Sequence, residues 1–420
     1  MTTTTASIDI DDSGLLGWWR AGTLEGRRAF VAAAMAWGLD AFDVMLFSLT
    51  LPDVIRDLGL TKTQAGALGS ITLLGGAAGG LIFGHIADRF GRTKALMGAV
   101  LIYSIFTGAC GLSQTLWQFA VFRALLGLGM GGVWAAGASL VSETWSSQLR
   151  GRVLGFMQSA WAIGFAAAAI VNAIIGPRFG WRAVFFVGVL PALFTIWVQR
   201  RVKEPAIWHA RVRASTSSAR FSDMFRGGML RITAIVTFMN ACALFGWWGL
   251  NGWIPAYLRL PRAEGGVGLG TETMSWFVVA MQVGMFVGYV SFGYLSDSMG
   301  RKRVYVAYLL AASVLLPLYG ALKLPAALLL LGPFVAFFGT GYFSGFGAVT
   351  AELYPTSIRA SAQGFTYNIG RIASAAAPFT VGSLATSNGF GIAFLVTGAA
   401  FLLGAISWIG IPETHGRELT

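Results

Sequence analysis

Four ionisable residues stand inside long apolar stretches of the chain: Asp40, Asp43, Arg123 and Arg371. A charged side chain at the centre of a membrane helix costs about 2.5–3.5 kcal/mol, so residues of this kind are kept for a functional reason by default. Asp40 and Asp43 are three residues apart and therefore share one face of a helix. Buried carboxylates can carry protons, and a buried guanidinium can hold a carboxylate through two parallel hydrogen bonds. These residue types predict proton and organic-anion chemistry inside a membrane.

The apolar stretches also set the depth of these residues. Counted at about 1.5 Å per residue, Asp43 and Arg123 lie at nearly the same level, so an ion pair between them is expected. Asp40 and Arg371 both fall near the midplane, where carriers built from repeated halves bind their substrates.

Other chemistries have few candidate residues at this depth. Cys110 and Cys242 stand singly in apolar runs, whereas His85, His209 and His415 fall in polar connections or at the C-terminus. Because these residues cannot assemble a metal site or a nucleophile within the membrane, neither a metal nor a cofactor is predicted, and an enzyme is not expected.

The composition requires a membrane environment. Of 420 residues, 55% are apolar and 11% charged, with a mean hydropathy of +0.67, whereas soluble proteins carry about 25% charged residues. A helix needs about 20 apolar residues to cross the hydrocarbon layer. The sequence predicts twelve such spans, at 29–55, 66–86, 95–113, 116–142, 152–176, 182–199, 231–258, 273–295, 304–322, 325–350, 361–385 and 389–411.

The spans form two groups of six that are copies of each other. Gly84 to Arg92 recurs as Gly293 to Arg301, and Glu143 with Arg150 recurs as Glu352 with Arg359, each at an offset of 209 residues. The expected organisation is an N-terminal tail at 1–28, a bundle at 29–199, a linker at 200–230, a second bundle at 231–411 and a C-terminal tail at 412–420.

The basic residues predict the orientation. With both ends in the cytoplasm, 21 of the 30 lysines and arginines fall in inner segments and 7 in outer loops, which is the excess that the positive-inside rule describes. This distribution explains the net charge of +12 without nucleic acid as a partner.

The repeated motifs resemble those of the major facilitator superfamily of secondary transporters over nearly the whole chain. Gly84-x3-Asp88-Arg89-x-Gly91-Arg92 is similar to its loop between helices 2 and 3, and Arg123-x3-Gly127-x-Gly129-x-Gly131-Gly132 is similar to its helix 4 motif. Asp40-Ala41-Phe42-Asp43 resembles the helix 1 motif of aromatic-acid, sialate and lactate proton symporters. The resemblance implies an all-α membrane protein of two pseudo-symmetric six-helix bundles, in the inner membrane of a bacterium.

The expected function is proton-coupled import of a small organic carboxylate by alternating access, by a monomer. Protonation of Asp43 would free Arg123 and leave the site more positive, and Arg371 would hold the substrate carboxylate. Asp40 would be a second proton site or would repel misplaced anions. Four polar residues at a suitable depth are further candidates for substrate binding, with hydrogen bonding between helices as the structural alternative: Gln158, Tyr367, Asn368 and Asn240.

A second group of residues is expected at the cytoplasmic face. The resemblance implies that they form a charged latch, which holds the inner gate shut in the outward-facing state. A plain basic loop would explain the arginines but not the repeated aspartates and glycines. The members are Gly84, Asp88, Arg89, Gly91, Arg92, Glu143, Arg150, Asp297, Arg301, Glu352 and Arg359.

Three alternatives remain open. Drug/proton antiporters often carry a Gly-Pro motif within helix 5, whereas Gly176-Pro177 comes only at the outer end of that span. Sugar:proton symporters share Pro412-Glu413-Thr414-x-Gly416, but their paired glutamines of helix 7 are not found around Asn240. A receptor of the same fold would bind a solute without transporting it.

Overall fold

The structure is a computed structural model that describes residues 17–204, 224–355 and 358–414, except for the side chains of residues 147, 148, 150, 151, 351, 360 and 361. All regular structure in these residues is helical. The first half contains α1 (Gly17–Ala21), α2 (Leu24–Asp57), α3 (Lys62–Phe90), α4 (Arg92–Gly111), α5 (Leu116–Thr144), α6 (Ser147–Val187) and α7 (Pro191–Arg201). The second half contains α9 (Gly228–Arg259), η2 (Arg262–Glu264), α10 (Thr271–Met299), α11 (Arg301–Ala321), α12 (Pro325–Thr340), η3 (Gly341–Gly345), α13 (Phe346–Leu353), α14 (Arg359–Ser374), α15 (Ala376–Ser387), α16 (Gly389–Ser407) and η4 (Trp408–Gly410).

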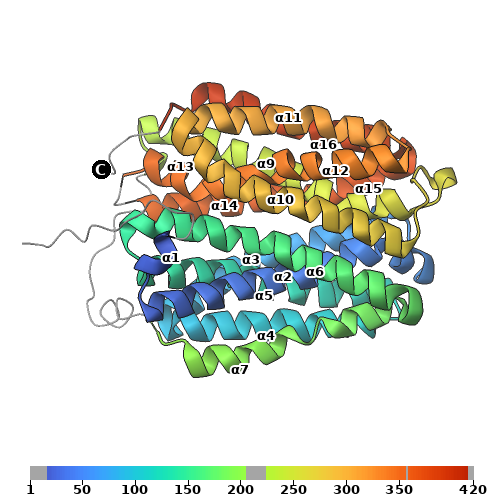
Figure 1. The fold of residues 1–420 in the computed structure, drawn as a ribbon, viewed down its shortest axis with the longest axis horizontal. Coiled ribbons are helices and arrows are strands. Elements are labelled where there is room, and N and C mark those ends of the chain that lie inside the picture. Colours follow the sequence, from blue (N-terminus) through green and yellow to red (C-terminus); the bar gives the residue numbers. More distant parts are fainter. Residues whose placement is uncertain (1–16, 205–223, 356–357, 415–420) are drawn as a thin grey trace, which may run out of the picture.

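The two halves lie side by side with their long helices roughly parallel, as Figure 1 shows. Ten helical stretches among the described residues are long and apolar enough to cross a membrane. One of them, Arg152–Arg201, contains two of the expected spans, and the chain bends inside it at Gly180, where φ is 76°. The span expected at 361–385 is divided between α14 and α15. The predicted all-α membrane fold of two six-helix bundles is confirmed, and these two features account for the difference between ten stretches and twelve spans.

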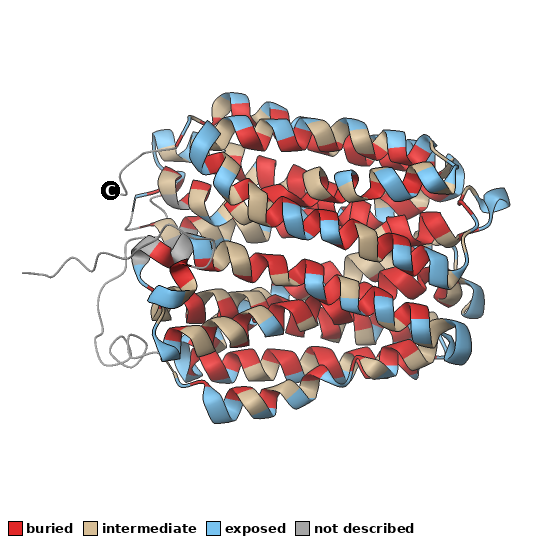
Figure 2. Ribbon diagram, in the orientation of Figure 1, coloured by how far each residue is buried: buried red, intermediate tan, exposed pale blue. Residues whose placement is uncertain are grey.

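Exposed apolar side chains cover the outside of the bundle. Trp117, Leu330 and Ile409 are among the most exposed large apolar residues, whereas Asp40, Asp43, Arg123 and Arg371 are buried. Figure 2 shows how buried and exposed residues are distributed along the helices. This is the reverse of a soluble surface and suits contact with lipid.

Glycines let the helices of the first half approach closely. A Cβ at Gly127 would lie 2.2 Å from the Thr72 carbonyl oxygen of α3, and a Cβ at Gly131 would lie 1.9 Å from that of Gly76. Any larger residue would separate α3 from α5, so the helix 4 motif serves helix packing. Arg123 begins this motif and is thereby fixed relative to α3.

Positive φ angles explain the repeated glycine of the loop motif. Gly91 between α3 and α4 has φ 117°, and Gly300 between α10 and α11 has φ 94°. Residues with a Cβ rarely adopt this region, so both turns require glycine. We refer to the end of the bundle that carries these two turns as the basic end, which lies at the left of Figure 1, and to the other as the far end.

Polar bonds join the halves at the far end. Arg259 on α9 donates to Asp53 on α2 at 2.9 Å, and Lys62 at the start of α3 donates to the Glu264 carbonyl at 2.7 Å. The halves also contact each other through their long helices: α3 packs against α15, and α6 packs along α10. The far end is therefore closed by direct contact between the halves.

Candidate functional site

The two acids of α2 lie in the interior of the bundle. Asp40 and Asp43 are both 0% exposed. Neither carboxylate oxygen of Asp40 has a hydrogen-bond partner among the described residues. The guanidinium of Arg371, from the other half, acts on Asp40 electrostatically. Asp40 and Arg371, which the sequence places at the midplane, thus lie within electrostatic range of each other.

Arg371 occupies the last turn of α14, just before the break between α14 and α15. It is 3% exposed, and its Nη1 lies 3.5 Å from the Gly76 carbonyl oxygen of α3. A Cβ at Gly76 would be only 3.1 Å from Nη2 of Arg371. Gly76 therefore provides the space in which the guanidinium crosses from one half to the other, a role that sequence reasoning missed.

Aromatic rings from both halves form a connected cluster that includes Tyr367, on which both Arg371 and Asp40 act electrostatically. We call them the central aromatic cluster; its members are Trp37, Trp134, Trp161, Trp247, Trp248, Phe343, Phe346 and Tyr367. Across the boundary between the halves, the rings of Trp161 and Trp247 are 5.4 Å apart, and those of Trp134 and Tyr367 are stacked at 6.3 Å. Sequence reasoning missed the cluster, although Trp37 precedes Asp40 by three residues and so shares its helix face.

Two indole donors in this region have no acceptor from the described residues. The indole Nε1 atoms of Trp37 and Trp161 are buried without a hydrogen-bond partner in the described part of the chain. Buried polar groups are normally paired, so each such group needs an explanation. Buried donors without an internal partner fit a site that receives an acceptor from outside the chain.

The four polar candidates occupy different positions. The Asn240 side chain is 1% exposed and unpaired among the described residues, and its Cβ packs against Gly370 beside Arg371. Gln158 is buried near the Tyr289 hydroxyl, and Tyr367 belongs to the central aromatic cluster. Asn368 donates to the Gly364 carbonyl of its own helix at 2.9 Å, so this bond lies within one helix and does not join two helices.

The expected ion pair between Asp43 and Arg123 is not formed in this structure. Asp43 instead contacts the Thr107 hydroxyl of α4 at 3.1 Å, and the Arg123 guanidinium lies 4.4 Å from the centre of the Phe47 ring. The expectation of a pair in this conformation is wrong because depth alone does not fix direction. Asp43 is directed toward α4 and the segment around Gly188, whereas Arg123 lines a cavity between the halves.

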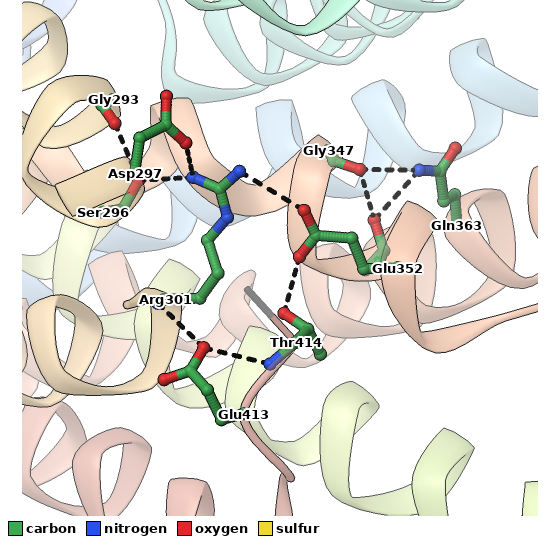
Figure 3. Close-up of polar contacts among 10 residues, drawn as sticks. Gly293, Ser296, Asp297, Arg301, Gly347, Glu352, Gln363, Glu413 and Thr414 are labelled. Carbon is green, nitrogen blue, oxygen red and sulfur yellow. Dashed lines mark hydrogen bonds and ion pairs between the residues drawn. The ribbon is translucent and has the colours of Figure 1, made fainter. Parts of the chain in front are cut away.

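Two matching charge clusters lie at the basic end, one in each half. In the first, Arg92 bonds Glu143 at 2.9 Å and also pairs with Asp88. In the second, Arg301 bonds Glu352 at 3.3 Å and also pairs with Asp297 (Figure 3). Each of these four ion pairs joins residues of the same half.

The remaining latch candidates lie around these clusters. Arg89 places its guanidinium 5.5 Å from the Phe90 ring centre, and Arg359 donates to the Tyr354 carbonyl. Gly84 has open space around its Cβ position. The side chain of Arg150 lies outside the described residues.

Each cluster has a further acid that sequence reasoning missed. Glu204 accepts backbone N–H bonds from Thr93 and Lys94 at the start of α4. Glu413 accepts the same kind of bond from Arg301 and Lys302 at the start of α11 (Figure 3). Carboxylates stabilise helix N-termini in this way. The two glutamates are 209 residues apart, so the repeat offset could have revealed them.

Comparison with known proteins agrees with this architecture. The chain is 33% identical over 405 residues to the cis,cis-muconate transport protein of Acinetobacter baylyi, covering 94% of this chain and 96% of that protein. It is 31% identical over 411 residues to a probable 4-methylmuconolactone transporter of Cupriavidus pinatubonensis (96% and 94% covered), and 29% identical over 395 residues to a sialic acid transporter of Escherichia coli (94% and 96% covered).

The solved structures include a similar fold. The crystal structure of a D-xylose-proton symporter matches with a TM-score of 0.74 at 21% identity, over 93% of this chain and 99% of that one. The family model of the Major Facilitator Superfamily matches residues 33–270 and 265–419. Together with the repeated six-helix bundles, these matches show that the chain is a transporter, not an enzyme, and belongs to the Major Facilitator Superfamily.

Proposed function

We propose that the protein imports a small, flat organic acid together with protons, by alternating access. The observation that carries this proposal is the buried pair of Asp40 and Arg371, which interact electrostatically across the boundary between the halves, close to Tyr367 of the central aromatic cluster. Substrate sites of secondary transporters lie at this boundary.

Asp40 and Asp43 supply the proton sites. A buried ionised carboxylate without hydrogen bonds is costly, and a bound proton removes its charge. When Asp40 is neutral, Arg371 has no internal counter-ion acting on it from that side, and a substrate carboxylate can take its place. One proton carried with one monoanion moves no net charge, so the pH gradient drives uptake more than the membrane potential does.

The aromatic walls favour a flat substrate. Indole faces stack on planar π systems, and their N–H groups donate to oxygen atoms at the edge of such a molecule. One relative is named for cis,cis-muconate, whose conjugated carbon chain is planar, and another for 4-methylmuconolactone, whose ring contains a tetrahedral carbon. A third is named for sialic acid, which is not flat. Transport of a flat acid compared with transport of sialic acid therefore tests the shape of the substrate.

The basic end is proposed to face the cytoplasm, with both termini on that side, as the positive-inside rule indicates. The closed far end and the separate charge clusters then correspond to a carrier that is not open to the outside. When the far end opens, the basic ends of the halves come together, and the two clusters meet as the latch. We expect a monomer to suffice, with 29–199 and 231–411 as the two moving units joined by the linker at 200–230.

Uptake into proteoliposomes tests the proposal. The purified protein is reconstituted into liposomes with an inward proton gradient, acidic outside. Uptake of labelled benzoate, cis,cis-muconate, sialic acid and xylose is measured with and without the gradient. Gradient-dependent uptake of a flat acid supports the proposal, and Asp43→Asn is expected to abolish it. Uptake of xylose alone would favour a sugar symporter, and binding without uptake would favour a receptor.

A further inference from the structure

A second binding position lies between the central aromatic cluster and the far end. It is a cavity of about 30 Å³ at the boundary between the halves, lined by residues of α2, α3, α5, α9 and α15. Arg123 is the only charged residue among those lining it. The remaining walls include Phe47, Trp248 and Trp253, together with the hydroxyl groups of Ser48 and Thr72.

The charge of Arg123 is unbalanced in this cavity. The side chain is 2% exposed, and its Nε and Nη1 atoms have no hydrogen-bond partner among the described residues. Asp43, the acid at the same depth, is bonded to Thr107 instead. The ring of Phe47 supports one face of the guanidinium at 4.4 Å but does not neutralise it. A buried cation without a counter-ion is costly, so an anion is the group that completes this site.

A hydroxyl group beside the cavity changes its role as the far end opens. The Ser48 hydroxyl of α2 donates to the carbonyl oxygens of Asn251 and Gly252 on α9, at 2.7 and 2.9 Å. These bonds connect the two halves and break when the halves separate. The freed hydroxyl then becomes a donor next to Arg123.

We propose that Arg123 forms a carboxylate-binding subsite that the substrate occupies first when it enters from the far end. This subsite rests on the proposed function and adds one step to it. The substrate carboxylate first binds both Arg123 and the Ser48 hydroxyl, and it then passes to Arg371. As the far end closes, Ser48 returns to α9 and the cavity shrinks to the size of a carboxylate group. Because Asp43 contacts Thr107 instead of Arg123, Arg123 is available for this step.

The test compares the two directions of transport. Exchange of labelled benzoate, nicotinate or cis,cis-muconate is measured at equal pH on both sides, so that proton coupling does not enter the readout. The half-saturating concentration is determined separately for entry from the far end and for exit from the basic end. Arg123→Gln is expected to raise the value for entry about tenfold or more and to change the value for exit less than about twofold. Arg371→Lys is expected to raise both.

A cavity-filling variant gives independent evidence if Arg123→Gln does not fold. A Cβ at Gly252 would meet no atom within 4 Å, and Gly252 lines the cavity, so Gly252→Val adds apolar volume there while keeping Arg123 itself. It is expected to raise the half-saturating concentration for entry alone. Gly391→Val on α16 is the matched control, since its Cβ position is also open and lies away from the cavity; no change is expected.

The possible results separate the two proposals. Equal effects of Arg123→Gln or Gly252→Val on entry and exit, or no effect on either, would overturn the subsite and leave the proposed function standing. Failure of the unmodified protein to exchange any of the three acids would overturn the proposed function, and the subsite with it.

Discussion

Gly76 on α3 is the residue on which the position of Arg371 depends. In a Gly76→Ala variant, the new Cβ would lie 3.1 Å from Nη2, 3.2 Å from Cζ and 3.4 Å from Nε of Arg371. Carbon atoms pack best at about 3.5–4.0 Å from their neighbours, so the guanidinium must move by a few tenths of an ångström. Its long side chain can do this without unfolding the helix, but the plane that meets the substrate carboxylate then shifts.

The size of the effect follows from the bonds at risk. A hydrogen bond to a charged group contributes about 1.5–3 kcal/mol, and about 1.4 kcal/mol changes an affinity tenfold. Displacement of one of the two parallel bonds is therefore expected to raise KM about ten- to hundredfold. Stability should hardly fall, because alanine is favoured over glycine by about 1 kcal/mol in a helix interior, which offsets the tighter contact.

Gly80→Ala is the matched control. It lies one turn further along α3 and also faces α14, but its Cβ would be 3.4 Å from the nearest atom, Oδ1 of Asn368. Uptake kinetics of the labelled acid and thermal unfolding are measured for both variants. An unchanged KM for Gly76→Ala, or an equal rise for both variants, would show that the guanidinium is not held in place by this contact. Combining Gly76→Ala with Arg371→Lys should add little, because both act on the same bond.

Four further predictions use the same transport assay. Asp43→Asn keeps a polar contact with Thr107 but removes the proton site, so accumulation driven by a pH gradient should be lost while exchange at equal pH persists; retained accumulation would contradict this. Thr107→Val removes the hydroxyl that contacts Asp43 and should shift the pH of half-maximal uptake, whereas Thr107→Ser should not; overlapping pH profiles for the Val variant and the unmodified protein would argue against this contact. Trp161→Leu should raise KM for benzoate about two- to tenfold, the value of one aromatic contact, whereas Trp161→Phe should retain most of the affinity; the same rise for lactate would rule out stacking. Glu204→Gln or Glu413→Gln weakens the bonds at the start of α4 or α11 and should lower the maximal rate without changing KM, and the reverse pattern would refute a role at the basic end.

Motif and composition together predicted the architecture. Apolar segments long enough to cross a membrane, interrupted by basic turns, allow only a helical membrane protein, since every backbone group must be bonded within its own segment in lipid. The 209-residue repeat then required two similar bundles. The break of α14 after Ser374 was not predicted, because the apolar run continues through it into α15.

Spacing along a helix was sufficient for residues on the same face and insufficient for partners on different helices. The spacing of three residues placed Asp40 and Asp43 on one helix face, and the same spacing could have placed Trp37 on that face. It did not show that Asp43 bonds Thr107 while Arg123 lies over Phe47. Both arrangements satisfy the same depth count, and only the rotation of α2 and α5 about their axes distinguishes them.

The sequence by itself determined which residues carry charge within the membrane and how deep each lies, because hydrophobic length and helical rise are local properties of the chain. The tertiary structure decided which of them meet. Arg371 reaches across the boundary of the halves because Gly76, almost three hundred residues earlier, leaves space for it. The aromatic rings of Trp161 on α6 and Trp247 on α9 also meet only in the folded molecule, where the two halves pack against each other through α2 with α9 and α6 with α10.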